Sequence, residues 1–278
     1  MTGRVVVLGS LNVDLVTEVD RHPRPGETVL AVGPLARLAG GKGGNQAVAA
    51  AEAGARVAMV GCVGGDDDGL RYLARLQARG IDTAGVRIVA GESTGQAWVT
   101  VDGEGENAIV VVPGANGSVG AADLGRLDRL GAGDVLLMQL EVPLRVVADA
   151  ARRARGRGAR VVVNAAPYAA LPHDVAALAD PVVVNEHEAL ALADSGIVPG
   201  SLLVTFGGEG CSWDGVEFPG TPVDAAQVLD TTGAGDAFCG ALAAALAEGV
   251  DRPEAVRRAS EAGAAAVRRQ GAQPDSAL

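Results

Sequence analysis

Short β-branched runs alternate with Ala- and Leu-rich stretches along most of the chain, and this alternation constrains the fold more than any other feature. That order is typical of a largely parallel sheet with helices on both faces. With 278 residues, 48% of them hydrophobic, the chain can bury such a core in a single domain spanning residues 1–278. We therefore predict an α/β, three-layer αβα fold. The expected strands are 4–8, 57–60, 135–138, 160–163, 181–184 and 202–205, and the expected helices include 46–53, 69–77 and 143–155.

Two segments, about 14–38 and 95–112, interrupt this pattern. Residues 100–111 alternate polar and apolar side chains around a glycine-rich centre, which indicates a β-hairpin. We expect the short strands of both segments to run antiparallel and to form a small sheet that projects from the main one. A small sheet beside a ligand cleft is suited to act as a lid.

Charge and composition exclude several classes of protein. A formal net charge of −11 argues against binding to nucleic acids or anionic membranes, which usually requires a basic face. The apolar run at the N-terminus is too short for a signal peptide, and no stretch is long enough to span a bilayer. The three cysteines, Cys62, Cys211 and Cys239, lack metal-ligand spacing. We expect a cytoplasmic protein with free thiols.

The run from Asp230 to Asp236, with sequence DTTGAGD, carries the strongest chemical signal. The small residues Gly233, Ala234 and Gly235 leave the backbone bare, and a helix is expected to start at about Asp236. Unpaired N–H groups at such a helix start form an anion-binding site. A carboxylate in the first turn can then take the proton from a hydroxyl placed beside that anion, as phosphoryl transfer requires.

A second glycine-rich segment, residues 40–45, precedes the predicted helix 46–53. It lacks the spacing of a P-loop, and no GxGxxG motif follows the first strand, so Walker-type and dinucleotide sites are both excluded. We interpret it as a loop that lets a ligand approach the backbone, with Lys42 and Asn45 as polar contacts. Lys42 is the only lysine in the chain.

Polar residues follow several of the predicted strands. Asn12 and Asp14 come after the first strand, Glu141 after strand 135–138, and Asn185 and Glu188 after strand 181–184. Residues 205–210 end another strand in a glycine-rich turn. Because the carboxyl ends of parallel strands share one sheet edge, we expect these groups to line one cleft. Its early residues are suited to sugar hydroxyls and its late residues to an anion.

These segments resemble those of the PfkB-type carbohydrate kinases, over about residues 4–275. Both signature regions of that family are present, the Gly40–Asn45 segment with its following helix and the Asp230–Asp236 run with its helix. The ribokinase group in particular is indicated by motifs at residues 9–14, 91–95, 103–107, 114–116, 138–141 and 271–274. The resemblance implies a ribokinase-like domain with a projecting β lid. We also expect a homodimer through this lid, because a lid sheet with one apolar face is often completed by a partner's lid.

The resemblance also implies roles for individual residues. Asp236 would be the base, with the backbone of Gly233, Ala234 and Gly235 as the anion hole. The sugar would contact Asn12, Asp14, Gly41, Lys42, Asn45 and Glu141. ATP would contact Asn185, Thr205, Gly207, Gly208, Glu209, Gly210 and Ser260. Glu188 would act indirectly on Mg²⁺, and K⁺ would be held by Asp230, Thr232, Ala266, Arg269 and Gly271.

The implied reaction is transfer of the γ-phosphoryl group of MgATP to a primary hydroxyl, with O5 of D-ribose as the first choice. Another acceptor, a deoxyribose, a ketose or a nucleoside, remains open, as does a non-catalytic sugar- or nucleotide-binding relative. The chain departs from the family pattern in a shorter connection between Glu188 and Leu202 and after Asp275. Both departures would leave apolar surface uncovered.

Overall fold

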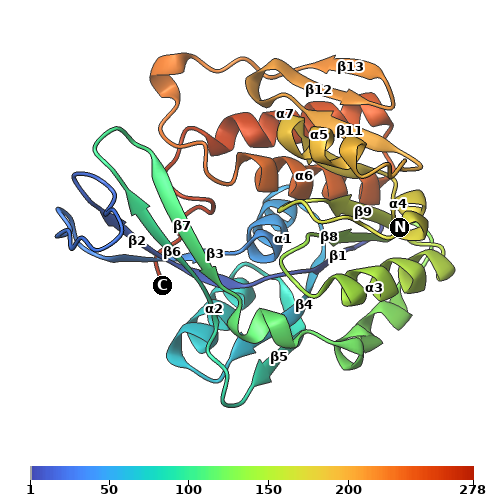
Figure 1. Ribbon diagram of the computed structural model, residues 1–278. Coiled ribbons are helices and arrows are strands. Elements are labelled where there is room, and N and C mark those ends of the chain that lie inside the picture. Colours follow the sequence, from blue (N-terminus) through green and yellow to red (C-terminus); the bar gives the residue numbers. More distant parts are fainter. Residues whose placement is uncertain (1) are drawn as a thin grey trace.

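The computed structural model describes residues 2–278, and its centre is a nine-stranded sheet (Figure 1). The neighbouring strands from β5 at one edge of the sheet to β11 all pair in parallel. At the other edge β12 pairs antiparallel with β11, and β13 pairs antiparallel with β12. The prediction of a mostly parallel sheet is confirmed. In spatial order the strands are β13 (Val216–Pro219), β12 (Gly210–Trp213), β11 (Leu202–Thr205), β10 (Val182–Asn185), β9 (Arg160–Asn164), β8 (Val135–Met138), β1 (Val5–Leu8), β4 (Val57–Gly64) and β5 (Asp82–Val89).

Helices cover both faces of this sheet. On one face lie α1 (Lys42–Glu52), α2 (Asp67–Ala78), α6 (Ala234–Glu248) and α7 (Arg252–Ala266), and on the other α3 (Leu144–Gly156), α4 (His173–Leu178), α5 (Glu186–Asp194) and the 3₁₀ segment η2 (Ala121–Arg129). Val5 and Val7 of the central strand β1 pack into the first core, and Val6 and Leu8 into the second. Because every residue of β1 is buried, its sequence is continuously apolar rather than alternating.

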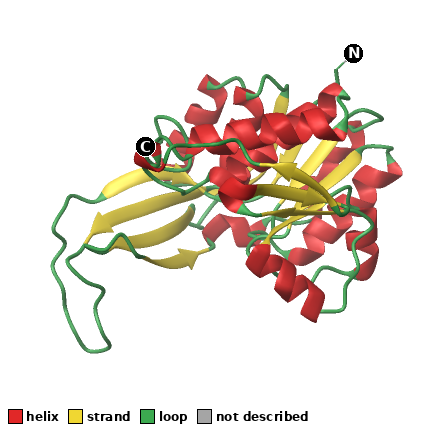
Figure 2. Cartoon of the chain, turned by 90° about the horizontal axis from the view of Figure 1, so that it is seen from above, coloured by secondary structure: helices red, strands yellow, loops and turns green. Residues whose placement is uncertain are grey.

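A second sheet of four strands projects from this body (Figure 2). Its order is β3 (Ala36–Gly40), β2 (Asn12–Glu18), β6 (Gly95–Val101) and β7 (Asn107–Val112). The predicted hairpin is β6–β7. The expectation of antiparallel strands throughout is wrong, because the central pair, β2 and β6, is parallel. Each follows a strand of the parallel main sheet, β1 or β5, after a short connection, so both enter the lid in the same direction.

Three helices begin earlier than predicted, among them α2, which starts at Asp67 rather than at residue 69. Helix α1 starts at Lys42 and α6 at Ala234, so the glycine-rich segment before residue 46 belongs largely to the first turn of α1. Gly43 is needed there for packing, since a Cβ at this position would lie 2.6 Å from the carbonyl carbon of Gly9. Of the glycines at positions 40, 41, 43 and 44, only Gly41, the N-cap of α1 with φ +81°, has a backbone conformation that favours glycine.

The connection from β10 to β11 contains α5 and a short loop. Leu190 of α5 and Val198 of the loop are both exposed. Among residues 2–278, no helix combines the length and the apolar content needed to cross a membrane.

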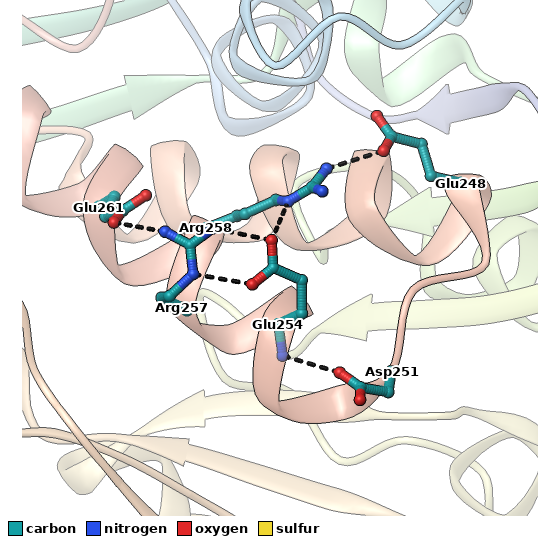
Figure 3. A network of polar contacts seen from close by, with 6 residues as sticks. All are labelled: Glu248, Asp251, Glu254, Arg257, Arg258 and Glu261. Carbon is teal, nitrogen blue, oxygen red and sulfur yellow. Dashed lines mark hydrogen bonds and ion pairs between the residues drawn. The ribbon is translucent and has the colours of Figure 1, made fainter.

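A network of ion pairs joins the end of α6 to the start of α7 (Figure 3). Glu254 accepts hydrogen bonds from Arg257 and Arg258, both at 2.7 Å, and Arg258 continues to Glu248 at 2.7 Å. Arg257 also binds Glu261. The hydrogen bonds from Arg257 and Arg258 lower the pKa of Glu254 to about 2.

Replacing Glu254 by glutamine is expected to lower the melting temperature slightly at pH 7, on the order of 1 °C, because exposed ion pairs are screened by water. The folded-state pKa lies below the ordinary value of 4.5, so the stabilisation is present above pH 4.5 and is lost as the pH falls toward 2. The difference between wild type and Glu254→Gln should therefore shrink in thermal melts from pH 6 to pH 3. Glu217→Gln, on the exposed edge strand β13, is the control and should show no such trend. A difference that is independent of pH would contradict this assignment.

Candidate active site

Asp236 lies in the first turn of α6 and is 6% exposed. The N-cap of this helix is Gly233, in the left-handed region at φ +77°, where a Cβ would lie 2.5 Å from Cα of Ala272. Its first turn opens onto a pocket of about 130 Å³ that several strand ends share. The pocket is lined by Lys42, Asn164, Ala166, Val183, Val184, Asn185, Glu188, Thr205, Gly233, Gly235, Asp236 and Cys239.

The pocket supports the predicted anion hole at two of its three positions. Gly233 and Gly235 line it, and the N–H groups of a first helical turn have no intrahelical acceptor. The N–H of Ala234 instead donates to the carbonyl of Thr231 at 3.3 Å, and Ala234 does not line the pocket. The anion hole over Gly233, Ala234 and Gly235 stays a prediction, which the pocket lining supports at Gly233 and Gly235.

Two side-chain amides hold the Asp236 carboxylate. Nδ2 of Asn45 donates to Oδ2 at 2.9 Å, and Nε2 of Gln46 donates to Oδ1 at 2.8 Å. Both amides belong to α1, which approaches α6 closely at Gly240, where a Cβ would lie 2.6 Å from the carbonyl of Gln46. Gln46 is a site residue that was not predicted from the sequence. Its signal was a long polar side chain at the start of an otherwise Ala-rich helix.

Asp14, Lys42 and Glu141 lie around Asp236 in one charged cluster. Burial raises the pKa of Asp14 to about 7, and the negative charges of Glu141 and Asp236 contribute. The charge of Asp236 raises the pKa of Lys42 against the opposing effect of burial, and Glu141 adds to it. Oε2 of Glu141 accepts from Oγ of Ser10 at 2.5 Å and from the Lys42 backbone N–H at 3.0 Å. One carboxylate thus connects the end of β1 to the start of α1.

A second pocket, of about 350 Å³, lies between the lid and the main sheet. Asn12, Glu141 and Val111 of β7 are among the residues that line it. Oδ1 of Asn12 accepts from Nδ2 of Asn116 at 2.7 Å, and Asn116 lies in the 3₁₀ segment η1 (Gly114–Ser118). Of the predicted sugar contacts, Lys42 lines the first pocket and Asn12 and Glu141 line the second, whereas Asp14, Gly41 and Asn45 line neither.

The predicted nucleotide residues are only partly brought together. Asn185 and Glu188 form a reciprocal cap at the start of α5, with Oε2 of Glu188 accepting from the Asn185 N–H at 2.8 Å. Both line the 130 Å³ pocket with Thr205. Gly207, Gly208 and Glu209 form the exposed 3₁₀ turn η3 (Gly207–Glu209), and Gly210 begins β12. Ser260 is half-buried in α7 and does not line that pocket, so its role stays a prediction.

Three of the predicted cation residues, Asp230, Thr232 and Gly271, meet beside the start of α6, and the roles of Ala266 and Arg269 stay predictions. The Asp230 carboxylate accepts from the backbone N–H groups of Thr232 at 2.8 Å and Gly271 at 2.9 Å, which fixes the two segments together. Carbonyl and carboxylate oxygens are the ligands that hard cations prefer. Within residues 2–278, no group of three or more His, Cys, Asp or Glu side chains is placed to hold a metal ion. A cation here would therefore depend mainly on backbone carbonyls.

Comparison with known proteins gives one consistent result. Residues 2–277 match the model of the pfkB family carbohydrate kinases. The chain is 37% identical to a ribokinase of Bacillus subtilis, over 97% of this chain and 94% of that protein, and 33% identical to a deoxyribokinase of Salmonella typhi, over 97% and 94%. Its fold is similar to that of Arabidopsis thaliana ribokinase complexed with ribose and ATP, with a TM-score of 0.86, 31% identity and coverage of 100% and 96%.

The raised pKa of Asp14 predicts that ionisation of this candidate site residue lowers the stability of the fold. A carboxyl whose folded pKa of about 7 exceeds its ordinary value of 3.8 contributes stability that is complete below pH 3.8 and is lost as the pH rises through 7. Asp14→Asn should therefore raise the free energy of unfolding at pH 8.5 by roughly 1–3 kcal/mol, with a smaller effect at pH 5.5. Urea denaturation at the two pH values measures this. The exposed Asp20→Asn should change neither, and an Asp14→Asn variant that is less stable at pH 8.5 would refute the prediction.

Proposed function

Because the chain belongs to the PfkB family of carbohydrate kinases, we propose that it transfers the γ-phosphoryl group of ATP to O5 of D-ribose, with Asp236 as the general base. One observation carries this proposal. The Asp236 carboxylate and the glycine-flanked first turn of α6 share a pocket, so an attacking hydroxyl and the group it attacks can lie side by side.

The proposed reaction uses the chain's own groups at each step. Asp236 takes the proton of the acceptor hydroxyl as the O5–phosphorus bond forms and the bond from the γ-phosphorus to the β–γ bridging oxygen breaks, releasing ADP. Asn45 and Gln46 orient the carboxylate through their 2.9 Å and 2.8 Å hydrogen bonds. The N–H groups of Gly233 and Gly235, with the positive end of α6, would stabilise the charge on the transferring group.

The sugar would lie at the base of the lid. Asn12, Asp14, Lys42 and Asn45 would bind its hydroxyls, together with the backbone of Gly41 and the carboxylate of Glu141. Supporting this, Asp14 and Lys42 interact electrostatically with both Glu141 and Asp236. When Asp14 is ionised it can accept two hydroxyl hydrogen bonds, as vicinal hydroxyls require.

Mg²⁺ and K⁺ fit the residues that the family resemblance implies. Glu188 faces the pocket with one carboxylate oxygen not engaged by the Asn185 N–H, so it can act on a hydrated Mg²⁺. Magnesium would neutralise charge on the phosphates. The carbonyls of Thr232, Ala266, Arg269 and Gly271, with Asp230, would hold K⁺ beside the helix start. We keep the cytoplasmic location as a prediction, since three buried free cysteines favour a reducing compartment.

Deoxyribose is the second candidate acceptor, because the Salmonella typhi deoxyribokinase matches the chain over nearly its whole length. The two sugars differ by one hydroxyl. A site that hydrogen-bonds this hydroxyl rejects the sugar lacking it strongly, so relative kcat/KM values discriminate between them.

Replacing Asp236 by asparagine should lower kcat roughly 10²–10⁴-fold, the usual contribution of a general base, with little change in folding. ADP release from MgATP, measured with ribose, deoxyribose, a ketose and a nucleoside, with and without K⁺, gives both the acceptor and the cation requirement. The exposed Asp224→Asn is the matched control. Near-wild-type turnover of Asp236→Asn would eliminate the proposed base, and activity with nucleosides alone would eliminate ribose. Ribose binding without turnover, with MgATP and K⁺ present, would indicate a non-catalytic relative.

We also propose that two copies of the chain associate through the lid. The pairing register puts Asp14, Ala97 and Val111 in one row, so Ile109 and Val99 share their face. Beyond Asp14 this face carries Val16, Val99 and Ile109, with Glu18 and Asn107 at its outer end, and Ile109 is 54% exposed. An apolar sheet face continuous with a ligand site is suited to a second, identical face.

Adjacent residues of β7 point to opposite faces of the lid, which gives a matched pair of variants. Ile109→Glu should convert a dimer to a monomer in analytical ultracentrifugation, because it buries a charge in the proposed contact. Val110→Glu, on the other face, should leave the dimer intact. The proposed face is wrong if Val110→Glu alone dissociates the protein. A wild type that stays monomeric across the whole concentration series removes the proposal altogether.

A further inference from the structure

The side-chain amide of Asn45 can face Asp236 in two ways. Its NH₂ end donates to a carboxylate, whereas its carbonyl end repels one. In the structure Nδ2 donates to Oδ2 of Asp236 at 2.9 Å, and Oδ1 accepts from Nε2 of Gln273 at 2.8 Å. Because both orientations fill the same space, the donor at the far end of the amide selects between them.

Gln273 is itself held with its donor end toward Asn45. It is 0% exposed, and its Nε2 donates a second hydrogen bond to Oη of Tyr72 at 2.9 Å. Tyr72 donates onward to the carbonyl of Gly40 at 2.7 Å. Oε1 of Gln273 accepts from Nε of Arg75 at 3.4 Å. A reversed Gln273 would place its carbonyl against Oδ1 of Asn45 and lose these contacts.

The segment that carries Gln273 is fixed at both ends. The Gly271 N–H donates to Asp230 at 2.9 Å, and beyond Gln273 the chain pairs with the edge of β3. There the Ala39 N–H donates to the Ser276 carbonyl at 2.7 Å, and the Leu278 N–H donates to the carbonyl of Arg37 at 3.0 Å. Gln273 therefore has a backbone position that the lid and the Asp230 loop jointly determine.

The other amide on Asp236 has a different support. Oε1 of Gln46 accepts from Nε2 of Gln139 at 2.5 Å, and Nε2 of Gln46 has a second acceptor in Oδ1 of Asn164 at 3.0 Å. Two groups thus fix Gln46. Among the hydrogen bonds that the Asn45 side chain makes within residues 2–278, only the one from Gln273 reaches its carbonyl end.

We propose that Gln273 is a positioning residue for the catalytic base, acting through Asn45. It touches neither Asp236 nor the proposed sugar contacts other than Asn45, yet it keeps the N–H of Asn45 on Oδ2. This inference rests on the proposed role of Asp236. Without Gln273, Asn45 can reverse, and the carboxylate loses one of its two N–H donors and the orientation they give it.

The test is Gln273→Met, which preserves length but removes the donor. We expect kcat to fall about 10- to 100-fold, as displacement of a catalytic group does, while KM for MgATP stays within about twofold. The acidic limb of the kcat–pH profile should move to higher pH, because a carboxylate that loses an N–H donor is protonated more easily. The variant replaces none of the other titratable groups that interact with Asp236, which are Asp14, Lys42, Tyr72 and Cys239, and of these only Tyr72 loses a hydrogen bond with Gln273.

A second background separates positioning from structural damage. In Asp236→Asn there is no base to position, so adding Gln273→Met should lower the residual rate less than about twofold. An equal loss in both backgrounds, or wild-type kcat in Gln273→Met, would overturn the proposal.

If Gln273→Met does not fold, Gln273→Glu keeps the side-chain volume and the Arg75 contact, and the same comparison applies. Gln77→Glu, on the exposed surface of α2, controls for the added charge. A wild type that does not phosphorylate any sugar would refute the proposed function instead.

Discussion

The close packing of α1 against α6 is the contact on which the site depends. Gly240 makes it possible, since a Cβ there would lie 2.6 Å from both the Gln46 carbonyl and Cβ of Ala49. Each of these helices begins at the same pocket, one with Lys42 and the other with the Gly233–Asp236 turn. A gap wider by one methyl group would separate the carboxylate from the two amides that hold it, because packed interiors transmit such changes. The chemistry therefore depends on the missing side chain at Gly240 as much as on the amides that hold the Asp236 carboxylate.

Electrostatics in the cleft oppose stability. Asp14, Glu141 and Asp236 gather negative charge in a poorly hydrated space, and Lys42 compensates only part of it. The fold tolerates this because each carboxylate but Asp14 has fixed donors, Asn45 and Gln46 for Asp236 and Ser10 for Glu141. Asp14 lies against Gly40, where a Cβ would come within 2.1 Å of its carboxylate. Such an unsupported carboxylate is ready to accept hydrogen bonds from a ligand.

The fold could be predicted in outline because strand and helix periodicity are local properties. β8 and β11 were predicted to the residue, and β6 and β7 lie inside the predicted lid segments, whereas β2 begins two residues before its segment and β3 ends two residues after it. The relative direction of the lid strands could not be predicted from local sequence, since the parallel pairing of β2 with β6 depends on how the chain enters the lid from β1 and β5 of the main sheet. The start of α1 was missed because glycines suggest a loop, whereas Gly43 and Gly44 are there for close packing with β1 and Tyr72.

In the site, Asp236 and Asn45 follow from motif spacing, and the structure brings them into contact. Gln273 and Tyr72 could not be found this way, because only the tertiary fold brings residues so distant in sequence together.

Lys42 is the one lysine of the chain, and it is largely buried between carboxylates in the cleft. Every other side-chain cation is a guanidinium, which does not react as a primary amine does. The surface consequently offers no lysine for acylation, for amine-directed cross-linking or for enzymatic attachment of other proteins. Any lysine-specific modification of this molecule must occur inside the cleft, so its extent would report directly on whether the cleft is occupied.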